Sequence, residues 1–222
     1  MNKSTHSRPF APQAAYKRLI ALRYWLLGAG LNNALVALDF NHPYFQGTRK
    51  DGLTPEFDHH VSQANFIRTL LPHLLFPEET LCLVFFHDTA EDHGVSPDEM
   101  ARVFSDPEFG KRVADGASRM TKKYRGGVGS ADTAEKLFKE MARCPISSIA
   151  KGVDRIHNLQ SMVGVFSPEK QRSYLAETEQ YFLPMLKSAE RTFPKQEPAY
   201  KIISTVLKMQ IELLTSTLPA DI

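Results

Sequence analysis

The spacing of apolar side chains is the feature of this 222-residue chain that most restricts its fold. Apolar residues recur mostly every three or four positions, which gives a helix a broad apolar face. Two such series run side by side near the end of the chain: Ile202, Val206, Met209 and Leu213, and Ile203, Leu207, Ile211 and Leu214. No stretch alternates convincingly with a period of two, so we expect no sheet of any size. The pattern predicts an all-α protein.

Three helix starts are marked by a capping residue followed by proline: Ser96-Pro97, which Glu99 completes as a capping box, Asp106-Pro107 and Ser167-Pro168. The predicted helices cover residues 13–29, 31–42, 56–75, 77–92, 97–104, 107–120, 131–143, 145–164, 168–191 and 198–217. A hydrophobic content of 42% is enough for one core. We expect a flexible tail over residues 1–12 and a single-domain helical bundle over residues 13–222.

Charge and cysteine content narrow the function. The 27 Lys and Arg residues exceed the 25 Asp and Glu residues by only two, without the basic excess of a dedicated nucleic-acid binder. No apolar run has the length of a membrane span. Cys82 and Cys144 do not form a CxxC pair, so neither a disulfide framework nor a structural zinc site is expected. These features favour a cytoplasmic protein with no membrane association.

A polar cluster interrupts the chain directly after the apolar run 81–86. The cluster contains His87, Asp88, Glu91 and Asp92. In a continuous helix Glu91 lies one turn after His87, and Asp92 one turn after Asp88. Burying carboxylates beside apolar residues is costly unless a cation neutralises them. The cluster therefore predicts a bound divalent metal.

Two further polar segments complete a candidate site. Asp154 lies in a helical stretch with Asn158 one turn later, so Asp154 is a candidate ligand and Asn158 a candidate substrate contact. Either His59 or His60 then completes a set of two imidazoles and two carboxylates. The alternative for Asp154 is an ion pair with Arg155 or a lysine on a solvent-exposed helix face.

Nitrogen and oxygen ligands without thiolate suit manganese, iron, cobalt or magnesium, and manganese is the first choice. Such an ion lowers the pKa of water and polarises a phosphoryl oxygen. Glu91 and Asp92, slightly removed from the ion, are then the groups that orient or deprotonate the attacking water. The predicted chemistry is phosphohydrolysis without a covalent intermediate.

Four segments, taken in order, resemble the hydrolase domain of the RelA/SpoT proteins: Arg49-Lys50-Asp51, His59, His87-Asp88-Thr89-Ala90-Glu91-Asp92 and Lys151-Gly152-Val153-Asp154-Arg155-Ile156-His157-Asn158-Leu159. The likeness covers roughly residues 46–184 and is greatest to the small alarmone hydrolases, which lack a synthetase domain. The ordered combination is more specific than an HD dipeptide alone. The resemblance implies an HD-type helical bundle in its hydrolase-only form.

The resemblance also implies an activity. It is removal of the 3′-pyrophosphate from guanosine tetraphosphate or pentaphosphate, the alarmones of the stringent response. By the same resemblance, Mn²⁺ is bound by His59, His87, Asp88 and Asp154. Glu91 and Asp92 match the pair that activates water.

Substrate contacts follow from the same resemblance. Arg49 and Lys50 match residues that lie against the base and phosphates, Asn158 matches a sugar contact, and Lys122 is a further phosphate partner. The alternative for these lysines and this arginine is an ordinary solvated loop charge. His157 is expected to be a packed or partly exposed imidazole, not a ligand.

Two departures from the family pattern leave alternatives open. Glu56 stands where the family has a tyrosine, which affects base or sugar recognition, and His60 stands where it has a proline. An adenosine alarmone or a pyrophosphorylated tRNA end is an alternative substrate, and an alarmone synthetase toxin is a candidate functional partner. An HD phosphohydrolase acting on other nucleotides and a non-catalytic nucleotide- or toxin-binding module are the alternative functions.

Overall fold

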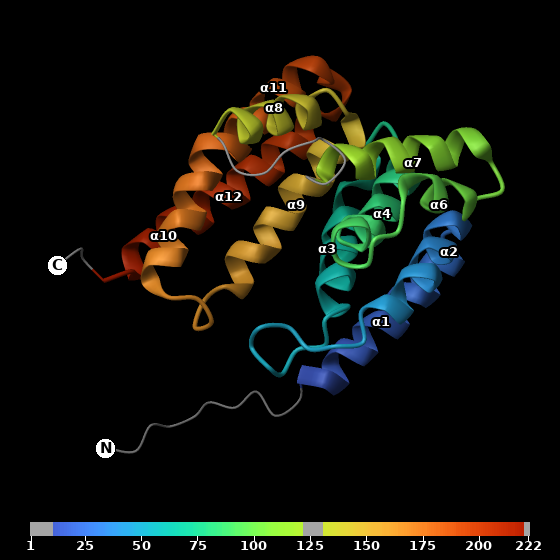
Figure 1. The fold of residues 1–222 in the computed structure, drawn as a ribbon, viewed down its shortest axis with the longest axis horizontal. Coiled ribbons are helices and arrows are strands. Elements are labelled where there is room, and N and C mark those ends of the chain that lie inside the picture. Colours follow the sequence, from blue (N-terminus) through green and yellow to red (C-terminus); the bar gives the residue numbers. More distant parts are fainter. Residues whose placement is uncertain (1–10, 122–130, 220–222) are drawn as a thin grey trace.

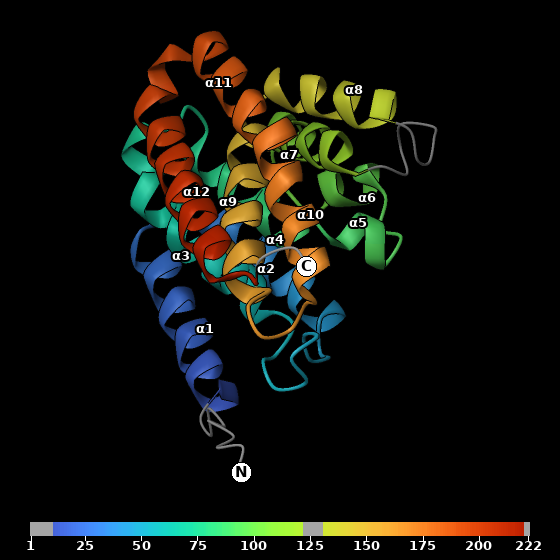
Figure 2. The same cartoon turned by 90° about the vertical axis from the view of Figure 1, so that its left-hand side faces the viewer.

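A computed structural model describes residues 11–121 and 131–219, and this part of the chain is a bundle of helices (Figures 1 and 2). Within it, β-structure is limited to one isolated bridge between Thr48 and Pro55. The prediction of an all-α protein is confirmed. The helices are α1 (Ala11–Gly28), α2 (Asn32–Asn41), α3 (Asp58–Leu70), α4 (Pro77–Phe86), α5 (Thr89–Asp92), α6 (Pro97–Arg102), α7 (Pro107–Met120), α8 (Ala131–Ala142), α9 (Pro145–Ser161), α10 (Pro168–Glu177), α11 (Leu183–Thr192) and α12 (Glu197–Thr217).

The predicted helix starts are confirmed by their side-chain caps. Ser96 and Glu99 form a reciprocal capping box at the start of α6. Asp106 accepts hydrogen bonds from the first turn of α7, and Ser167 accepts one from the first turn of α10. Each cap satisfies backbone N–H groups that have no partner within the helix.

Helices α4 and α9 form the centre of the bundle. Helix α4 packs against α2, α3, α7 and α9, and every residue from Glu79 to Phe86 is buried. This explains its continuous apolar run, because a helix covered on all sides has no solvent-facing stripe. Helix α9 in turn packs against α3 and α4 on one side and α11 and α12 on the other, as Figure 1 shows.

Gly152 allows α9 to lie unusually close to its neighbours. A Cβ atom at this position would be 2.8 Å from Ile203 Cγ2 and 3.0 Å from Leu186 Cδ2. A larger residue here would require these side chains or α9 itself to shift. Gly152 therefore favours close packing of α9, which carries Asp154, against α11 and α12.

Two predicted helices are interrupted. The predicted helix 77–92 is wrong at its centre, because α4 ends at Phe86 and α5 begins at Thr89. Thr89 Oγ1 donates to Asn41 Oδ1 of α2 at 2.5 Å, a tertiary contact that holds the turn. The predicted helix 168–191 contains the π-helical turn Thr178–Phe182 between α10 and α11. At the first of these places a tertiary contact, which helix propensity cannot report, accompanies the break.

Only one of the two apolar series on α12 is buried. Ile203, Leu207, Ile211 and Leu214 belong to the core. Ile202, Met209 and Leu213 are exposed, so only part of the broad apolar face is buried. The face of α12 that contacts α9 and α11 is narrower than the apolar surface of the helix.

Other composition-based predictions can be compared with the described part of the chain. Cys82 and Cys144 are buried free thiols, as the absence of a CxxC pair predicted. Over residues 11–121 and 131–219, helices long and apolar enough to cross a bilayer are absent. The predicted tail lies mostly outside the described residues, and its flexibility stays a prediction.

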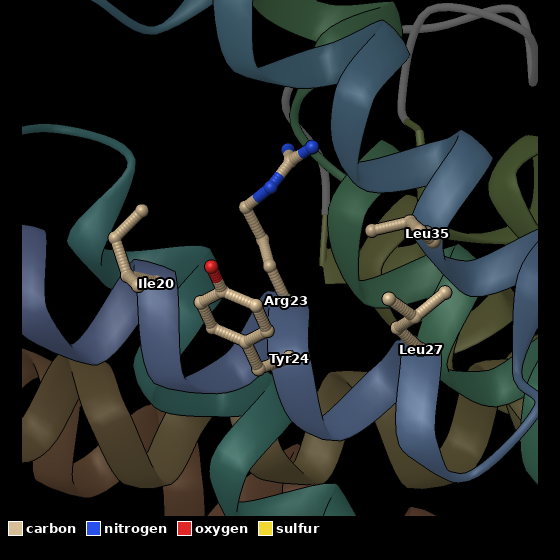
Figure 3. A pocket seen from close by; sticks show the side chains of 5 residues that line it. All are labelled: Ile20, Arg23, Tyr24, Leu27 and Leu35. Carbon is tan, nitrogen blue, oxygen red and sulfur yellow. The ribbon is translucent and has the colours of Figure 1, made fainter.

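A shallow apolar depression lies between α1 and α2 (Figure 3). Ile20, Arg23, Tyr24, Leu27 and Leu35 line it, and the Tyr24 side chain is 72% exposed. It shares no residue with the polar cluster described next.

Candidate metal centre

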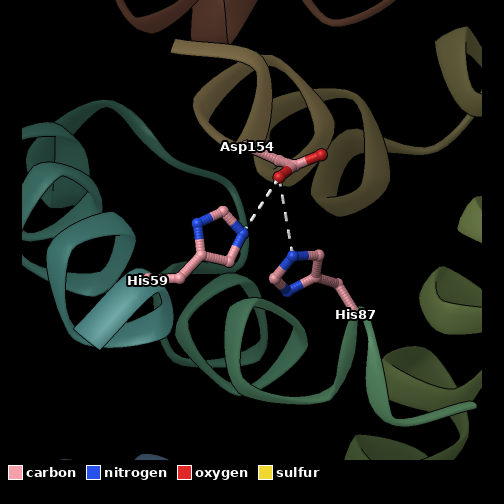
Figure 4. A group of neighbouring side chains, drawn as sticks. All are labelled: His59, His87 and Asp154. Carbon is pink, nitrogen blue, oxygen red and sulfur yellow. Dashed lines mark ion pairs between the residues drawn. The ribbon is translucent and has the colours of Figure 1, made fainter. Parts of the chain in front are cut away.

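Three buried polar side chains from distant parts of the sequence meet at the centre of the bundle (Figure 4). They are His59 on α3, His87 at the end of α4 and Asp154 on α9. Asp154 Oδ1 lies 3.2 Å from His59 Nε2 and 3.6 Å from His87 Nε2. All three are at most 4% exposed. Their ligand atoms are close enough together to hold one metal ion.

Asp88 lies at the solvent-facing edge of this group. Its Oδ2 is 3.1 Å from His87 Nε2 and 3.8 Å from His59 Nε2, and its side chain is 37% exposed. Adjacent donors around an ion with bonds of roughly 2.1–2.2 Å lie about 3 Å apart. The four residues predicted as ligands therefore lie together at spacings that suit a small divalent cation.

Hydrogen bonds orient both imidazoles. His87 Nδ1 donates to the Val84 carbonyl at 2.7 Å, which leaves the lone pair of Nε2 facing the carboxylates. His59 Nδ1 lies 2.7 Å from His157 Nδ1. Burial, followed by the charges of His59 and Arg49, lowers the pKa of His157 to about 3, so His157 is neutral and accepts from His59. Both histidines thus present Nε2 to the centre, the arrangement found in metal-binding histidines.

Asp154 is an ionised carboxylate held by neighbours on its own helix. Lys151 Nζ lies 2.9 Å from its Oδ2, and Asn158 Nδ2 donates to its Oδ1 at 2.7 Å. Burial alone raises its pKa, but Lys151 and the two histidines outweigh burial and hold the pKa of Asp154 well below its usual range. The alternative interpretation was an ion pair of Asp154 on a solvent-exposed helix face. Asp154 does form an ion pair with a lysine, Lys151, but the carboxylate is buried in the bundle. Arg155 pairs with Glu177 instead.

The electrostatic environment at His87 favours positive charge. Burial alone lowers the pKa of His87, but the charge of Asp88 and hydrogen bonds with Asp154 and Asp88 outweigh it and raise the pKa to about 10. A group that stabilises a proton this strongly also stabilises a metal cation at the same lone pair. The donor set, two imidazoles and two carboxylates without thiolate, fits a divalent metal of the manganese, iron or magnesium type.

The predicted water-activating carboxylates lie outside the buried group. Glu91 and Asp92 are exposed on the single turn α5, so the expectation that they are buried is wrong. The helix breaks at residues 87–88, so both carboxylates lie on a separate short helix after the buried run of α4. Partial burial, then the charges of Asp88 and Glu91, raises the pKa of Asp92. Asp92 therefore lies close enough to Asp88 to sense its charge.

The predicted substrate contacts lie where the α2–α3 loop meets the end of α9. Arg49 Nη2 donates to Ser161 Oγ at 3.2 Å, and Lys50 Nζ lies 5.3 Å from the centre of the Phe166 ring. Figures 1 and 2 both show this loop beside the α9–α10 connection. Asn158, predicted as a sugar contact, bonds to Asp154. Lys122 lies outside the described residues.

The sequence analysis did not identify Gln63 as a residue of the centre, and it did not decide whether His59 or His60 belongs there. Gln63 is 1% exposed, and its Nε2 lies 2.6 Å from His59 Nε2. Its position four residues after His59 was the available signal. His60 is equally buried, packs against Phe45 and Phe57, and has no hydrogen-bond partner at either ring nitrogen. Of the two adjacent histidines, His59 is the one that faces Asp154.

The helical architecture and the buried His/Asp group are consistent with an HD-domain type of helical bundle. No protein-family model matches the chain. A probable GTP pyrophosphokinase of Mycobacterium leprae is 30% identical over 128 residues, which are 58% of this chain and 16% of that protein. A probable guanosine-3′,5′-bis(diphosphate) 3′-pyrophosphohydrolase of Synechocystis is 28% identical over 63% of this chain and 18% of that protein.

A bifunctional (p)ppGpp synthase/hydrolase RelA of Mycobacterium tuberculosis is 29% identical over 58% of this chain and 17% of that protein. The homologues of this chain are therefore proteins of the RelA/SpoT family. Each match spans less than a fifth of the relative, so the names of the whole relatives do not by themselves define what this chain does.

Proposed function

We propose that this protein is a metal-dependent hydrolase that removes pyrophosphate from the 3′ position of guanosine tetraphosphate or pentaphosphate, or of a related adenosine alarmone. The observation that carries the proposal is the convergence of His59, His87, Asp88 and Asp154, with an exposed carboxylate pair beside them. A relative named as a 3′-pyrophosphohydrolase supports the reaction type. Cytoplasmic location is part of the same proposal.

Mn²⁺ is the proposed metal, held by the two imidazoles and two aspartates. When bound there, a divalent ion supplies Lewis acidity, which acidifies water and polarises a phosphoryl oxygen. His157 and the Val84 carbonyl hold His59 and His87 with their Nε2 lone pairs directed inward. Lys151 and Asn158 hold the Asp154 carboxylate.

Glu91 and Asp92 are the proposed proton acceptors. In the reaction, water forms a bond to the phosphorus attached to the 3′ oxygen, and the bond between that phosphorus and oxygen breaks. A carboxylate of this pair takes the proton of the attacking water, and the leaving 3′ oxygen gains a proton. The raised pKa of Asp92, caused by partial burial and then by its acidic neighbours, makes it a better base than an ordinary aspartate.

Arg49 and Lys50 are the proposed contacts for the phosphates and base, and Lys122 is a further proposed phosphate contact. Arg49 is half-buried against the end of α9, so its guanidinium has a defined place. Asn158 is proposed to reach the sugar as well as to hold Asp154. Pairing with an alarmone synthetase toxin, and action on pyrophosphorylated tRNA ends, belong to this proposal as roles to be tested.

The test is release of pyrophosphate from guanosine tetraphosphate by purified, Mn²⁺-loaded protein, with the nucleotide product identified. Asp154→Asn should reduce turnover by a factor of about 1,000 or more, since it removes a charged ligand. Asp98→Asn, an exposed aspartate on α6, is the matched control and should keep wild-type activity.

Folded, metal-loaded protein that releases pyrophosphate from no 3′-pyrophosphorylated nucleotide would refute the proposal. Hydrolysis of other nucleotides would favour an HD phosphohydrolase of different specificity. Tight nucleotide binding without turnover would favour a binding module. In cells, Asp88→Ala should abolish protection against an alarmone synthetase toxin if neutralisation is enzymatic.

A further inference from the structure

Gln63 directs its side-chain amide into the candidate metal centre. It lies on α3 one helical turn after His59 and is buried. Its Nε2 atom lies 2.6 Å from His59 Nε2, 3.4 Å from Asp154 Oδ1 and 3.5 Å from His87 Nε2. One end of the Gln63 amide therefore contacts three of the residues that hold the metal in the proposed function, on which this inference rests.

The groups around this end of the amide are ones that can bind a cation. The Nδ1 atoms of His59 and His87 are engaged with His157 and the Val84 carbonyl, so each imidazole, in the neutral form that binds a metal, has its lone pair on Nε2. The Asp154 carboxylate is an acceptor as well. Such a cluster needs either a hydrogen-bond donor or a cation. In the orientation described, the Gln63 amide nitrogen supplies the donor.

The other end of the amide does not fix its orientation. Gln63 Oε1 is buried and has no hydrogen-bond partner. A half-turn about the last side-chain torsion exchanges Oε1 and Nε2 with little change of shape. Because Oε1 gains no hydrogen bond at the outer position, the contacts at the inner position favour one orientation over the other. Beside a cation, the carbonyl oxygen is the favoured inner atom, since it is a ligand for hard divalent ions and the N–H group is not.

We propose that Gln63 is a fifth protein ligand of the metal centre, binding through Oε1. Its contacts of 2.6 to 3.5 Å with the other donors match the spacing of about 3 Å expected for adjacent ligands of one ion. With five protein ligands, a six-coordinate ion would keep one position for water or a phosphoryl oxygen.

His60 is the other buried polar group near the centre without a partner. It forms a second group with His87 and Asp88, in which the ligand atoms lie within 4.8 Å of one another. This is looser than the contacts of Gln63. The aromatic packing of His60 against Phe45 and Phe57 also accounts for its burial.

The experiment compares metal binding by wild type, Gln63→Leu and Gln63→Glu after removal of metal with a chelator. Leucine keeps the bulk without a donor, whereas glutamate keeps an oxygen donor and adds charge. Each protein is titrated with Mn²⁺ against a chromogenic chelator, and with Co²⁺ while its visible absorption is recorded. Circular dichroism verifies the fold of each metal-free protein, and Gln63→Ala replaces Gln63→Leu if the leucine disturbs packing.

The matched control is Gln210→Leu. Gln210 is a partly buried glutamine on α12, and its side chain donates to the Ile156 carbonyl. The substitution therefore removes a glutamine amide whose hydrogen bond is made away from the proposed ligands. Its metal affinity should equal that of wild type.

We expect Gln63→Leu to bind Mn²⁺ about 10- to 100-fold more weakly than wild type. Its Co²⁺ complex should absorb visible light more strongly because the ion has fewer ligands. Gln63→Glu should bind at least as tightly as wild type. If Gln63→Leu bound Mn²⁺ as tightly as wild type, the inference would be overturned. Tighter binding would also overturn it, because it would show that the Gln63 amide occupies the site and must move away before the ion binds. Wild type that binds no divalent metal would instead refute the proposed metal centre itself.

Discussion

The two halves of the candidate site differ most in burial. His59, His87 and Asp154 are at most 4% exposed. Each makes a hydrogen bond that orients it: His59 with His157, His87 with the Val84 carbonyl and Asp154 with Asn158. Glu91 and Asp92 lie on an exposed single turn of helix beside them. The difference in burial matches two different tasks, metal binding by the buried residues and proton transfer by the exposed carboxylates. A rigid, dry set of donors suits a metal ion, whereas proton acceptors and substrate contacts need access to water and nucleotide.

The largest effect is expected on the exposed half. Asp92→Asn keeps the shape of the side chain but removes the proton acceptor, so kcat should fall by a factor of roughly 100 to 10,000. Mn²⁺ affinity should stay at the wild-type value, and the free energy of unfolding should change by less than about 0.5 kcal/mol because the residue is exposed. Steady-state kinetics, metal titration and urea unfolding measure these quantities.

Glu91→Gln, made in parallel, shows which carboxylate of the pair carries the proton. If Asp92→Asn lost metal binding, and if this loss alone explained the fall in turnover, Asp92 would be a metal ligand. The separation of the site into a metal-binding half and a proton-accepting half would then be wrong.

An intermediate effect is expected where the buried half depends on helix packing. Gly152→Ala places a methyl group 2.8 Å from Ile203 Cγ2, so α9 must move or the side chains around it must shift. The free energy of unfolding should fall by about 1–3 kcal/mol. Metal affinity should fall too, because Asp154 lies on the same helix. Urea unfolding and Mn²⁺ titration test this pair of changes.

Gly28→Ala is the control for that substitution, since an added Cβ there meets nothing within 4 Å. It should be neutral within about 0.5 kcal/mol. A Gly152→Ala protein as stable as wild type would show that the packing of α9 does not depend on the absence of a side chain at position 152.

The smallest effect on activity concerns the pH dependence of stability, to which the residues around the buried half contribute. Burial, then the charges of His59 and Arg49, lowers the pKa of His157 to about 3, whereas an unfolded histidine titrates near 6.5. Between these values the unfolded chain binds a proton that the folded protein does not. The free energy of unfolding of metal-free protein should therefore fall as pH falls from 6.5 toward 3, by at most about 1.4 kcal/mol per pH unit for this residue.

The lowered pKa values of His59 and His60, both caused first by burial, add to this dependence with the same sign. His157→Gln should flatten the slope of stability against pH, measured by urea unfolding between pH 7 and pH 4. His73→Gln, an exposed histidine, should leave it unchanged. An identical slope in wild type and His157→Gln would mean that His157 is protonated in the folded protein.

Local signals in the sequence predicted much of the fold. The caps at Ser96, Asp106 and Ser167 act within one helical turn, so they form as predicted. The break at His87 and Asp88 was missed because it depends on a bond between Thr89 and α2, far away in the sequence. Propensity cannot report a contact of that kind.

The same distinction applies to the candidate site. By itself, the sequence determined the all-helical class and indicated which acidic and imidazole side chains interrupt apolar segments, because periodicity and composition are local properties. Only the tertiary structure decided that Asp154 is buried while Glu91 is exposed, and that Gln63 faces the centre. The reason is physical: which side of a helix meets a shared centre depends on how α3, α4 and α9 pack together.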